Sequence, residues 1–331
     1  MSLVVDGAEW DFNGWSLADV IEAIDRLVGR VSTARDRNEI VWIGDDFQTR
    51  LMFGDCDLWS LFSPEAELQL PPELGHELAA WLGRARCYLD EEPWPDWIVE
   101  TRVQVDELPV QENCDQAWAH HNVRTGTPVA CLSLKRAGAH KTMSNLGSVS
   151  VHWIVDETTN RAFWRSAIDV HRGTADALER YAPHAFPSLF FHPDVWQGLS
   201  TFAGGYLAVR TEVQRYLAVL DDYGNWAFTA PPPALSPSEP AGPEVDLLPT
   251  DQIVERRFRG LNLDMAPENP NIRAHTSCRQ AREVIVGNRT LYCEWHGKLQ
   301  PHRNRIHIHA PVSESDGKVV IAKFHEHLQL P

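Results

Sequence analysis

Basic and histidine side chains gather on one side of three predicted strands near the C-terminus. The strands span residues 290–299, 303–310 and 318–328, and in the second strand Ile306 and Ile308 alternate with polar residues. Because successive side chains of a strand point to opposite faces, the apolar residues of all three strands can face one core. The opposite face then collects Glu294, His296, Lys298, Arg303, Arg305, His307, His309, Lys323, His325 and His327.

This set of side chains suits the cleavage of RNA by transesterification. The reaction needs a base that takes the proton of the 2′-hydroxyl, a cation near the phosphoryl oxygens, and an acid for the leaving oxygen. Histidine is the usual residue for both proton transfers near neutral pH. We therefore predict catalytic roles for Glu294, Arg305, His307, His309 and His325.

The remaining cations of this face can bind the RNA backbone. Arginine grips a phosphate through two parallel hydrogen bonds, and lysine acts as a point charge. An aromatic ring on the same strands can stack on a base. The predicted nucleic-acid-binding residues are Lys298, Arg303, Lys323 and Tyr292.

Two other interpretations of this face stay open. Histidines two positions apart on a strand share a face, and imidazole suits zinc, iron or copper. The alternative metal ligands are His307, His309, His325 and His327, although the neighbouring cations would repel a metal ion, and we expect no cofactor. The face could also be a non-enzymatic docking surface within a larger assembly, or merely the solvated side of an antiparallel sheet.

Charge is distributed unevenly along the chain. Residues 251–331 contain twelve Lys/Arg and nine Asp/Glu, a net charge of +3. Because the whole chain has a net charge of −16, the remaining residues have a net charge of −19. This asymmetry predicts a C-terminal region that binds an anion such as RNA. It also predicts an acidic N-terminal body that binds a protein partner or masks the basic region.

Composition limits the class of protein. A hydrophobic share of 43% in 331 residues is typical of a globular chain with more than one domain. Six cysteines without C-x-x-C spacing favour neither a zinc ribbon nor a disulfide scaffold. The first residues lack the features of a signal peptide, and no apolar run is long enough for a membrane helix. We expect a cytoplasmic protein without membrane contact.

Local signals predict helices and strands in the first 229 residues. Ser16 is placed to cap a helix that continues through Val28, and a helix is expected over 73–89. Asp45, Asp46, Asp55 and Asp57 are interpreted as turn residues, and the histidines at 120, 121, 152, 184 and 192 as core or cap residues. Further expected strands are 39–43 paired with 51–53, 129–134, 148–155 and 226–229, and further helices are 163–177 and 212–220.

Seven prolines between residues 231 and 249 predict the domain boundary. Such a segment suits neither a helix nor a sheet interior, so residues 230–250 are expected to be a linker. The predicted domains are an acidic mixed α/β body, residues 1–229, which a division near residue 100 could split, and a small domain, residues 251–331. In the small domain, helices over 251–259 and 276–286 precede an antiparallel sheet. The predicted class is α+β.

The helix followed by three strands resembles the C-terminal half of RelE/ParE-type toxins. The matching stretches are 291–298, 303–309 and 319–327, about 80 residues with their helices, and residues 1–229 carry no such resemblance. The resemblance implies a toxin–antitoxin or bacterial defence role, with a small concave sheet that cleaves RNA, including ribosome-bound mRNA, without a metal. It implies an active arginine at Arg303 or Arg305, and a basic or histidine residue at Lys323, His325 or His327.

Overall fold

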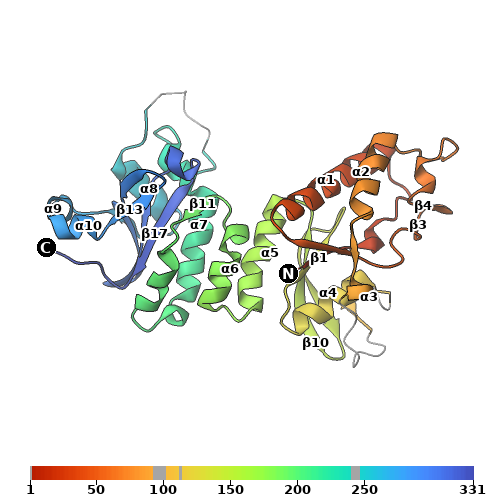
Figure 1. The fold of residues 1–331 in the computed structure, drawn as a ribbon, viewed down its shortest axis with the longest axis horizontal. Coiled ribbons are helices and arrows are strands. Elements are labelled where there is room, and N and C mark those ends of the chain that lie inside the picture. Colours follow the sequence, from red (N-terminus) through yellow and green to blue (C-terminus); the bar gives the residue numbers. More distant parts are fainter. Residues whose placement is uncertain (1, 92–101, 112–113, 240–246) are drawn as a thin grey trace. The chain divides into compact units, whose positions relative to one another are not determined.

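The computed structural model describes residues 2–91, 102–111, 114–239 and 247–331 (Figure 1). The chain divides into two compact units, an N-terminal unit, Met1–His171, and a C-terminal unit, Arg172–Pro331. Both units contain helices and sheets, which confirms the predicted α+β class. The boundary between the units lies far from the proline-rich segment.

The N-terminal unit is built on an eight-stranded sheet of order β5-β2-β1-β8-β10-β9-β6-β7. The first five strands in this order are parallel, and the last three are antiparallel to their neighbours. One sheet thus contains strands from both sides of residue 100, so the predicted division there is wrong, although residues 92–101 themselves lie outside the described residues. The strands are β1 (Ser2–Val5), β2 (Ile40–Ile43), β5 (Arg86–Cys87), β6 (Gln104–Val105), β7 (Leu108–Pro109), β8 (Val129–Leu132), β9 (Gly138–Ser144) and β10 (Gly147–Ile154).

The first helix, α1 (Leu17–Asp36), begins as predicted. The Ser16 side chain accepts a hydrogen bond from the Asp19 backbone N–H, and Val20, Ile24 and Leu27 form part of the buried face. The helix predicted over 73–89 is shorter than expected, because α2 (Pro72–Leu82) ends at Gly83. The predicted pairing of strands 39–43 and 51–53 is wrong, because β3 (Leu51–Phe53) pairs with β4 (Cys56–Asp57) instead of with β2. The remaining helical elements are η1 (Gly7–Glu9), η2 (Ser60–Phe62), α3 (Tyr88–Glu91), α4 (Asp115–Arg124) and α5 (Glu157–Val170).

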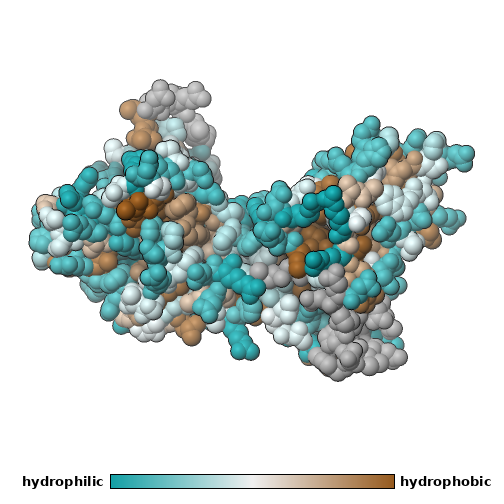
Figure 2. Space-filling view, viewed as in Figure 1, coloured by the Kyte–Doolittle hydropathy of each residue, from teal (hydrophilic) through white to brown (hydrophobic). Residues whose placement is uncertain are grey.

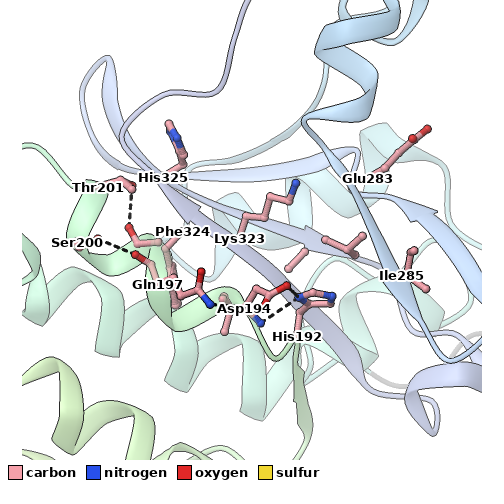
Figure 3. A pocket seen from close by; sticks show the side chains of 14 residues that line it. His192, Asp194, Gln197, Ser200, Thr201, Glu283, Ile285, Lys323, Phe324 and His325 are labelled. Atoms are coloured by element: carbon pink, nitrogen blue, oxygen red, sulfur yellow. Dashed lines mark hydrogen bonds and ion pairs between the residues drawn. The ribbon is translucent and has the colours of Figure 1, made fainter.

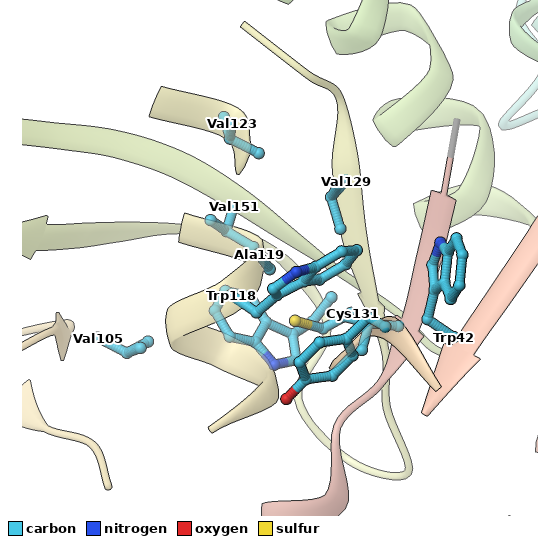
Figure 4. Packing of buried hydrophobic residues seen from close by; sticks show 11 residues of the cluster. Trp42, Val105, Trp118, Ala119, Val123, Val129, Cys131 and Val151 are labelled. Atoms are coloured by element: carbon cyan, nitrogen blue, oxygen red, sulfur yellow. The ribbon is translucent and has the colours of Figure 1, made fainter. Parts of the chain in front are cut away.

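Large aromatic residues fill the core on the α4 side of this sheet (Figure 4). Tyr88 stacks on Trp118 with ring centroids 4.6 Å apart, and Trp42 meets Trp118 edge-on at 6.3 Å. The rings and Trp153 are at most 2% exposed. Burial of such large apolar side chains is the main stabilising contribution to this unit.

The C-terminal unit contains a five-stranded sheet of order β11-β17-β16-β15-β12. β15, β16 and β17 are antiparallel neighbours, as predicted, and β11 joins the edge of β17 as a parallel strand. The bounds are β11 (Leu189–Phe191), β12 (Met265–Pro267), β15 (Trp295–Gln300), β16 (Arg303–His309) and β17 (Val319–His325).

Residues before the proline-rich segment complete this unit. The helix α7 (Arg210–Thr229) donates a hydrogen bond from the Tyr216 hydroxyl to the Lys298 carbonyl at 2.8 Å, and Phe228 meets Trp295 edge-on. The predicted strand 226–229 is therefore the end of α7. Because β11 and α7 share a sheet and a core with β15–β17, the predicted domains 1–229 and 251–331 are wrong.

The described part of the proline-rich segment is packed on α8 (Asp251–Gly260). Arg257 of α8 is 0% exposed and donates hydrogen bonds to the carbonyls of Ala227, Ala230, Pro231 and Ala234 at 2.8–3.2 Å. These bonds hold the segment as part of the C-terminal unit. The predicted linker is thus wrong for residues 230–239, and residues 240–246 lie outside the described residues.

A hairpin replaces the helix predicted over 276–286. The helix α10 (Thr276–Gln280) is short, and the β-branched run Val284–Val286 belongs to β13 (Glu283–Val286), which pairs with β14 (Arg289–Tyr292). Gly287, with φ of +59°, makes the turn. The predicted strand 290–299 is consequently two strands, β14 and β15. The other elements are α6 (Ala175–Ala185), α9 (Pro270–Ala274), η3 (Val195–Thr201), η4 (Tyr206–Ala208) and η5 (Ser313–Ser315).

Candidate functional site

The predicted polar face forms two rows across the C-terminal sheet. His296, His307 and Lys323 are directly opposite one another on β15, β16 and β17. Lys298, Arg305 and His325 form the next row. Ile306 and Ile308 are both 0% exposed, and Ile306 alternates with Arg305 and His307 as predicted. The sequence therefore identified this face, although not what covers it.

His307 lies under a buried ion pair. The Glu268 carboxylate and the Arg282 guanidinium approach to 2.8 Å, with both side chains at most 5% exposed, and His307 Nδ1 is 3.7 Å from Glu268 Oε1. The His307 ring is 0% exposed, neither ring nitrogen makes a hydrogen bond, and burial lowers its pKa well below the ordinary value. His296 lies 3.4 Å from the same carboxylate, and burial lowers its pKa to about 4.

The prediction that His307 acts on RNA is therefore corrected. A ring without exposed surface cannot contact a polymer, and Arg282 closes the site further by donating to the carbonyls of Cys278 and Gln329. Arg305 is half-buried, its Nη1 has no hydrogen-bond partner, and burial lowers its pKa. These residues belong to the packed interior between the sheet and residues 268–282.

The other predicted side chains are spread over the unit. Glu294 lies 3.8 Å from Arg273, whose guanidinium also lies 5.2 Å from the centroid of the Tyr292 ring. Lys298 pairs with Asp264 at 3.2 Å. His309 and His327 each form a hydrogen bond through Nδ1 with the carbonyl of the next residue. Arg303 is exposed at the start of β16.

The alternative metal site does not form. His307 is buried under Glu268, whereas His309 and His327 turn to the carbonyls of Ala310 and Leu328. Within the described part of the chain, no group of three or more histidine, cysteine, aspartate or glutamate residues could hold a metal ion. Asp46 and Asp57, interpreted from the sequence as turn residues, pair with Arg50 and accept a hydrogen bond from the Ser60 N–H, respectively.

Two predicted residues, Lys323 and His325, meet at a cavity of about 740 Å³ (Figure 3). We call this the β17 pocket, since β17 forms one wall. The opposite walls come from η3, from the loop that follows β11, and from β13. The polar side chains that line it are His192, Asp194, Gln197, Ser200, Thr201, Glu283, Lys323 and His325.

Sheet pairing and one glycine hold the walls of the pocket in place. Lys323 and His325 are two positions apart on β17 and so share a face. His192 directly follows β11, and its backbone N–H donates to the Ile321 carbonyl at 3.0 Å. Gly198 of η3 lies so close to β17 that a Cβ atom there would be 2.0 Å from the Phe324 oxygen. Only glycine permits this approach.

Each basic group of the pocket has one fixed hydrogen bond. Lys323 Nζ donates to the Ala281 carbonyl at 2.6 Å, and burial lowers the pKa of this lysine. His192 Nδ1 accepts from the Asp194 backbone N–H at 3.3 Å. His325 Nδ1 accepts from the His327 backbone N–H at 3.1 Å, and burial lowers the pKa of His325. The pocket therefore holds three oriented nitrogen groups.

The sequence assigned His192 the role of a core or cap residue and placed it in another domain. Its side chain is 13% exposed and lines the β17 pocket. The local sequence Phe-His-Pro-Asp after an apolar run indicates the end of a strand. It contains no signal that this strand pairs with β17, more than 120 residues later.

Comparison of the chain with family models, with curated proteins and with solved structures found no match. All six cysteines, each within the described residues, are free thiols. No helix among those residues is long and apolar enough to cross a membrane. Hydrophilic side chains cover most of the surface visible in Figure 2, with smaller hydrophobic areas between them.

Proposed function

We propose that the C-terminal unit binds single-stranded RNA and that the β17 pocket receives a phosphate group of that RNA. The observation that carries the proposal is the meeting of His192, Lys323 and His325, from two different strand ends, at one cavity of about 740 Å³. Imidazole N–H groups and an ammonium group are donors that suit phosphoryl oxygens. A cavity of this volume is in the range of sites for small ligands and ligand fragments.

An apolar wall beside these donors supports a nucleotide rather than a free anion as ligand. Val195, Val284 and Ile285 line the same cavity, and Ile285 is 66% exposed. A nucleotide presents a charged phosphate and a flat, largely apolar base face, so it can use both kinds of surface. The resemblance of β15–β17 to the sheet of RelE/ParE-type toxins supports RNA as the polymer.

Endoribonuclease activity is the second candidate, and the pocket's carboxylates favour it. Asp194 and Glu283 line the cavity with Lys323, and the Asp194 side chain is 73% exposed. A carboxylate can take the proton of a 2′-hydroxyl, and a nearby ammonium group can stabilise charge on the phosphoryl oxygens. We propose that any such cleavage needs no metal. The acidic N-terminal unit, with 14 Lys/Arg against 28 Asp/Glu, would serve as the surface for a protein partner.

The test measures binding of the full chain to a fluorescein-labelled single-stranded RNA by fluorescence anisotropy, with EDTA present. We expect Lys323→Ala to weaken binding about tenfold, since a charged hydrogen bond contributes about 1.5–3 kcal/mol. Lys318→Ala is the matched control, because Lys318 lies outside the residues that line the pocket. Binding should also weaken with salt, at a slope of about −0.7 for the one phosphate that the pocket receives.

The same samples, run on a denaturing gel, test cleavage. Metal-independent cutting of RNA, with no cutting of DNA of the same sequence, would establish transesterification, because DNA lacks the 2′-hydroxyl. Binding without cutting would support RNA binding and reject endoribonuclease activity. Equal binding by the Lys323→Ala and Lys318→Ala variants, or no binding by the full chain, would reject the proposal.

A further inference from the structure

We infer that the neutral imidazoles of His192 and His325 carry their proton on Nε2, and that with Lys323 they form an array of fixed donors for a phosphate oxyanion. The inference rests on the proposed function and names the chemistry of its ligand. It also assigns the two histidines a role in binding, and it excludes them as acceptors of a substrate proton at Nε2.

The backbone around His192 determines its tautomer. A neutral imidazole has one protonated nitrogen and one with a lone pair, and the hydrogen bond at one nitrogen determines the other. The Asp194 N–H points at His192 Nδ1 at 3.3 Å, so Nδ1 has the lone pair and Nε2 has the proton. The Asp194 carboxylate is 4.0 Å from Nδ1, beyond hydrogen-bond distance, so the backbone N–H is the hydrogen-bond partner of this nitrogen.

His325 is held in the same tautomer by a different segment. The His327 N–H donates to His325 Nδ1 at 3.1 Å, so the proton of the neutral ring is again on Nε2. The charged groups nearest along and across the strands are Lys323, Glu326 and Arg305. Burial is the largest effect on this ring and lowers the pKa of His325; Lys323 also disfavours a second proton, whereas Glu326 favours it.

The hydroxyl groups of the pocket do not add further donors. Ser200 Oγ donates to the Gln197 carbonyl at 2.8 Å, and Thr201 Oγ1 donates to the Gly198 carbonyl at 2.7 Å. Both bonds lie within η3 and leave only acceptor lone pairs for a ligand. Ligand donors therefore come from the two Nε2–H groups, the Lys323 ammonium and the Gln197 amide.

An array of this kind favours a ligand that only accepts hydrogen bonds. A phosphate oxyanion has such oxygens, whether it is inorganic phosphate, a terminal monoester or an internal diester. A ring that already carries a proton on Nε2 cannot take another there. If the pocket cleaves RNA, the proton of the 2′-hydroxyl must consequently go to a group other than these histidines.

Nuclear magnetic resonance of the full chain, labelled with ¹⁵N-histidine, tests the inference with inorganic phosphate as the probe. Long-range ¹H–¹⁵N correlations report the tautomer, and His192→Gln and His325→Gln identify the signals. We expect the Nε2–H tautomer for both neutral rings at about pH 8, and phosphate-dependent shifts of both Nε2 signals. His302, exposed in the β15–β16 turn, should not shift. His192→Ala and His325→Ala should each weaken phosphate binding about tenfold.

Different outcomes separate this inference from the proposed function. An Nδ1–H tautomer of either neutral ring, or no phosphate-dependent shift, would overturn the inference. RNA binding without any shift of these histidines would reject the donor array and retain RNA binding elsewhere on the unit. Phosphate binding at both rings together with failure to bind RNA would support the array and reject the RNA function.

Discussion

Asp6 in the N-terminal unit and Arg282 in the C-terminal unit are both buried ionisable residues, and their surroundings differ in kind. Asp6 is 0% exposed and accepts hydrogen bonds from Trp153 Nε1 and Gln116 Nε2, each at 2.7 Å. Both donors are neutral. Arg282 is 2% exposed and pairs with the Glu268 carboxylate at 2.8 Å. One unit thus surrounds a buried acid with dipoles, and the other pairs a buried base with a charge.

The acids of the N-terminal unit gather where its parallel strands end. Asp6 follows β1, and Asp115, at the start of α4, accepts from the Gly7 N–H at 2.9 Å. A Cβ atom on Gly44, after β2, would lie 2.8 Å from Asp115 Oδ1, so glycine lets the carboxylate approach the backbone. Burial raises the pKa of Asp115 to about 6 and also raises the pKa of Asp6.

The buried arginines of the C-terminal unit cannot become neutral by losing a proton, so they need hydrogen-bond acceptors. A guanidinium stays charged at every physiological pH, so burial requires a carboxylate or several carbonyls as partners. Arg282 has Glu268 and two carbonyls, and Arg257 has four carbonyls. A buried acid can therefore respond to pH by protonation, whereas a buried arginine depends on its partners.

The largest expected effect is the loss of the Arg282 partner. Glu268→Gln leaves a buried guanidinium without its counter-charge and should lower the stability of the C-terminal unit by about 3–5 kcal/mol. Hydrogen exchange followed by mass spectrometry should show faster exchange in residues 172–331 and little change in residues 1–171. Glu294→Gln is the matched control, because its pair with Arg273 is 3.8 Å long and exposed. Equal effects of the two variants would contradict a special role of the buried pair.

A smaller loss is expected when the buried acid changes in the N-terminal unit. Asp6→Asn replaces an acceptor oxygen by an NH₂ group that faces the donors of Trp153 and Gln116, at a cost of about 2–3 kcal/mol. Exchange should accelerate in residues 1–171 alone. Asp11→Asn, at an exposed position whose carboxylate accepts hydrogen bonds from Asn13, should leave exchange unchanged. An Asp6→Asn variant as stable as the unmodified chain would show that the carboxylate is not needed for folding.

The two units should respond differently to acid. His296, His307 and His325 of the C-terminal unit have pKa values lowered by burial, so the unfolded unit binds more protons below pH 6.5 and stability falls from pH 6.5 to 4. His120, His121 and His152 of the N-terminal unit, each with pKa about 4, act likewise. There, however, the raised pKa values of Asp6 and Asp115 favour the folded state as pH falls and offset part of the loss.

Scanning calorimetry between pH 7 and 4.5 measures this difference. We expect two transitions, of which the one shifted by Glu268→Gln belongs to the C-terminal unit and moves further on acidification. In Asp115→Asn the offset is reduced, so the N-terminal transition should become more sensitive to acid. Parallel movement of both transitions in the unmodified chain would contradict the proposed difference between buried acids and buried bases.

The smallest effect is expected at an exposed ion pair of the C-terminal unit. Arg289 and Glu314 lie 3.3 Å apart, and the Arg289 side chain is 53% exposed. Surface pairs of this kind contribute roughly 0–1 kcal/mol, so Arg289→Ala should shift the calorimetric midpoint by little. A loss comparable with that of Glu268→Gln would show that exposure does not separate the two pairs.

The amino-acid sequence is enough to predict the features that depend on neighbouring residues. The alternation at Arg305, Ile306 and His307 identified the two faces of β16, and Ser16 identified the start of α1, because strand period and helix capping are local properties. Lys323 and His325 were also predicted to lie together on the polar face, since they are two positions apart on one strand. The antiparallel order of β15, β16 and β17 followed from their short connections.

Which of these side chains are accessible depends on long-range packing. His307 lies on the predicted face, but Glu268 and Arg282 come from residues before the first predicted strand and cover it. His192 reaches the β17 pocket because β11 pairs in parallel with β17. Parallel pairing needs a long connection and leaves no periodic signal that joins the two segments. The observed boundary between the units differs from the predicted one for the same physical reason. Local patterns predict the secondary structure of each segment, whereas long-range burial determines which segments pack together.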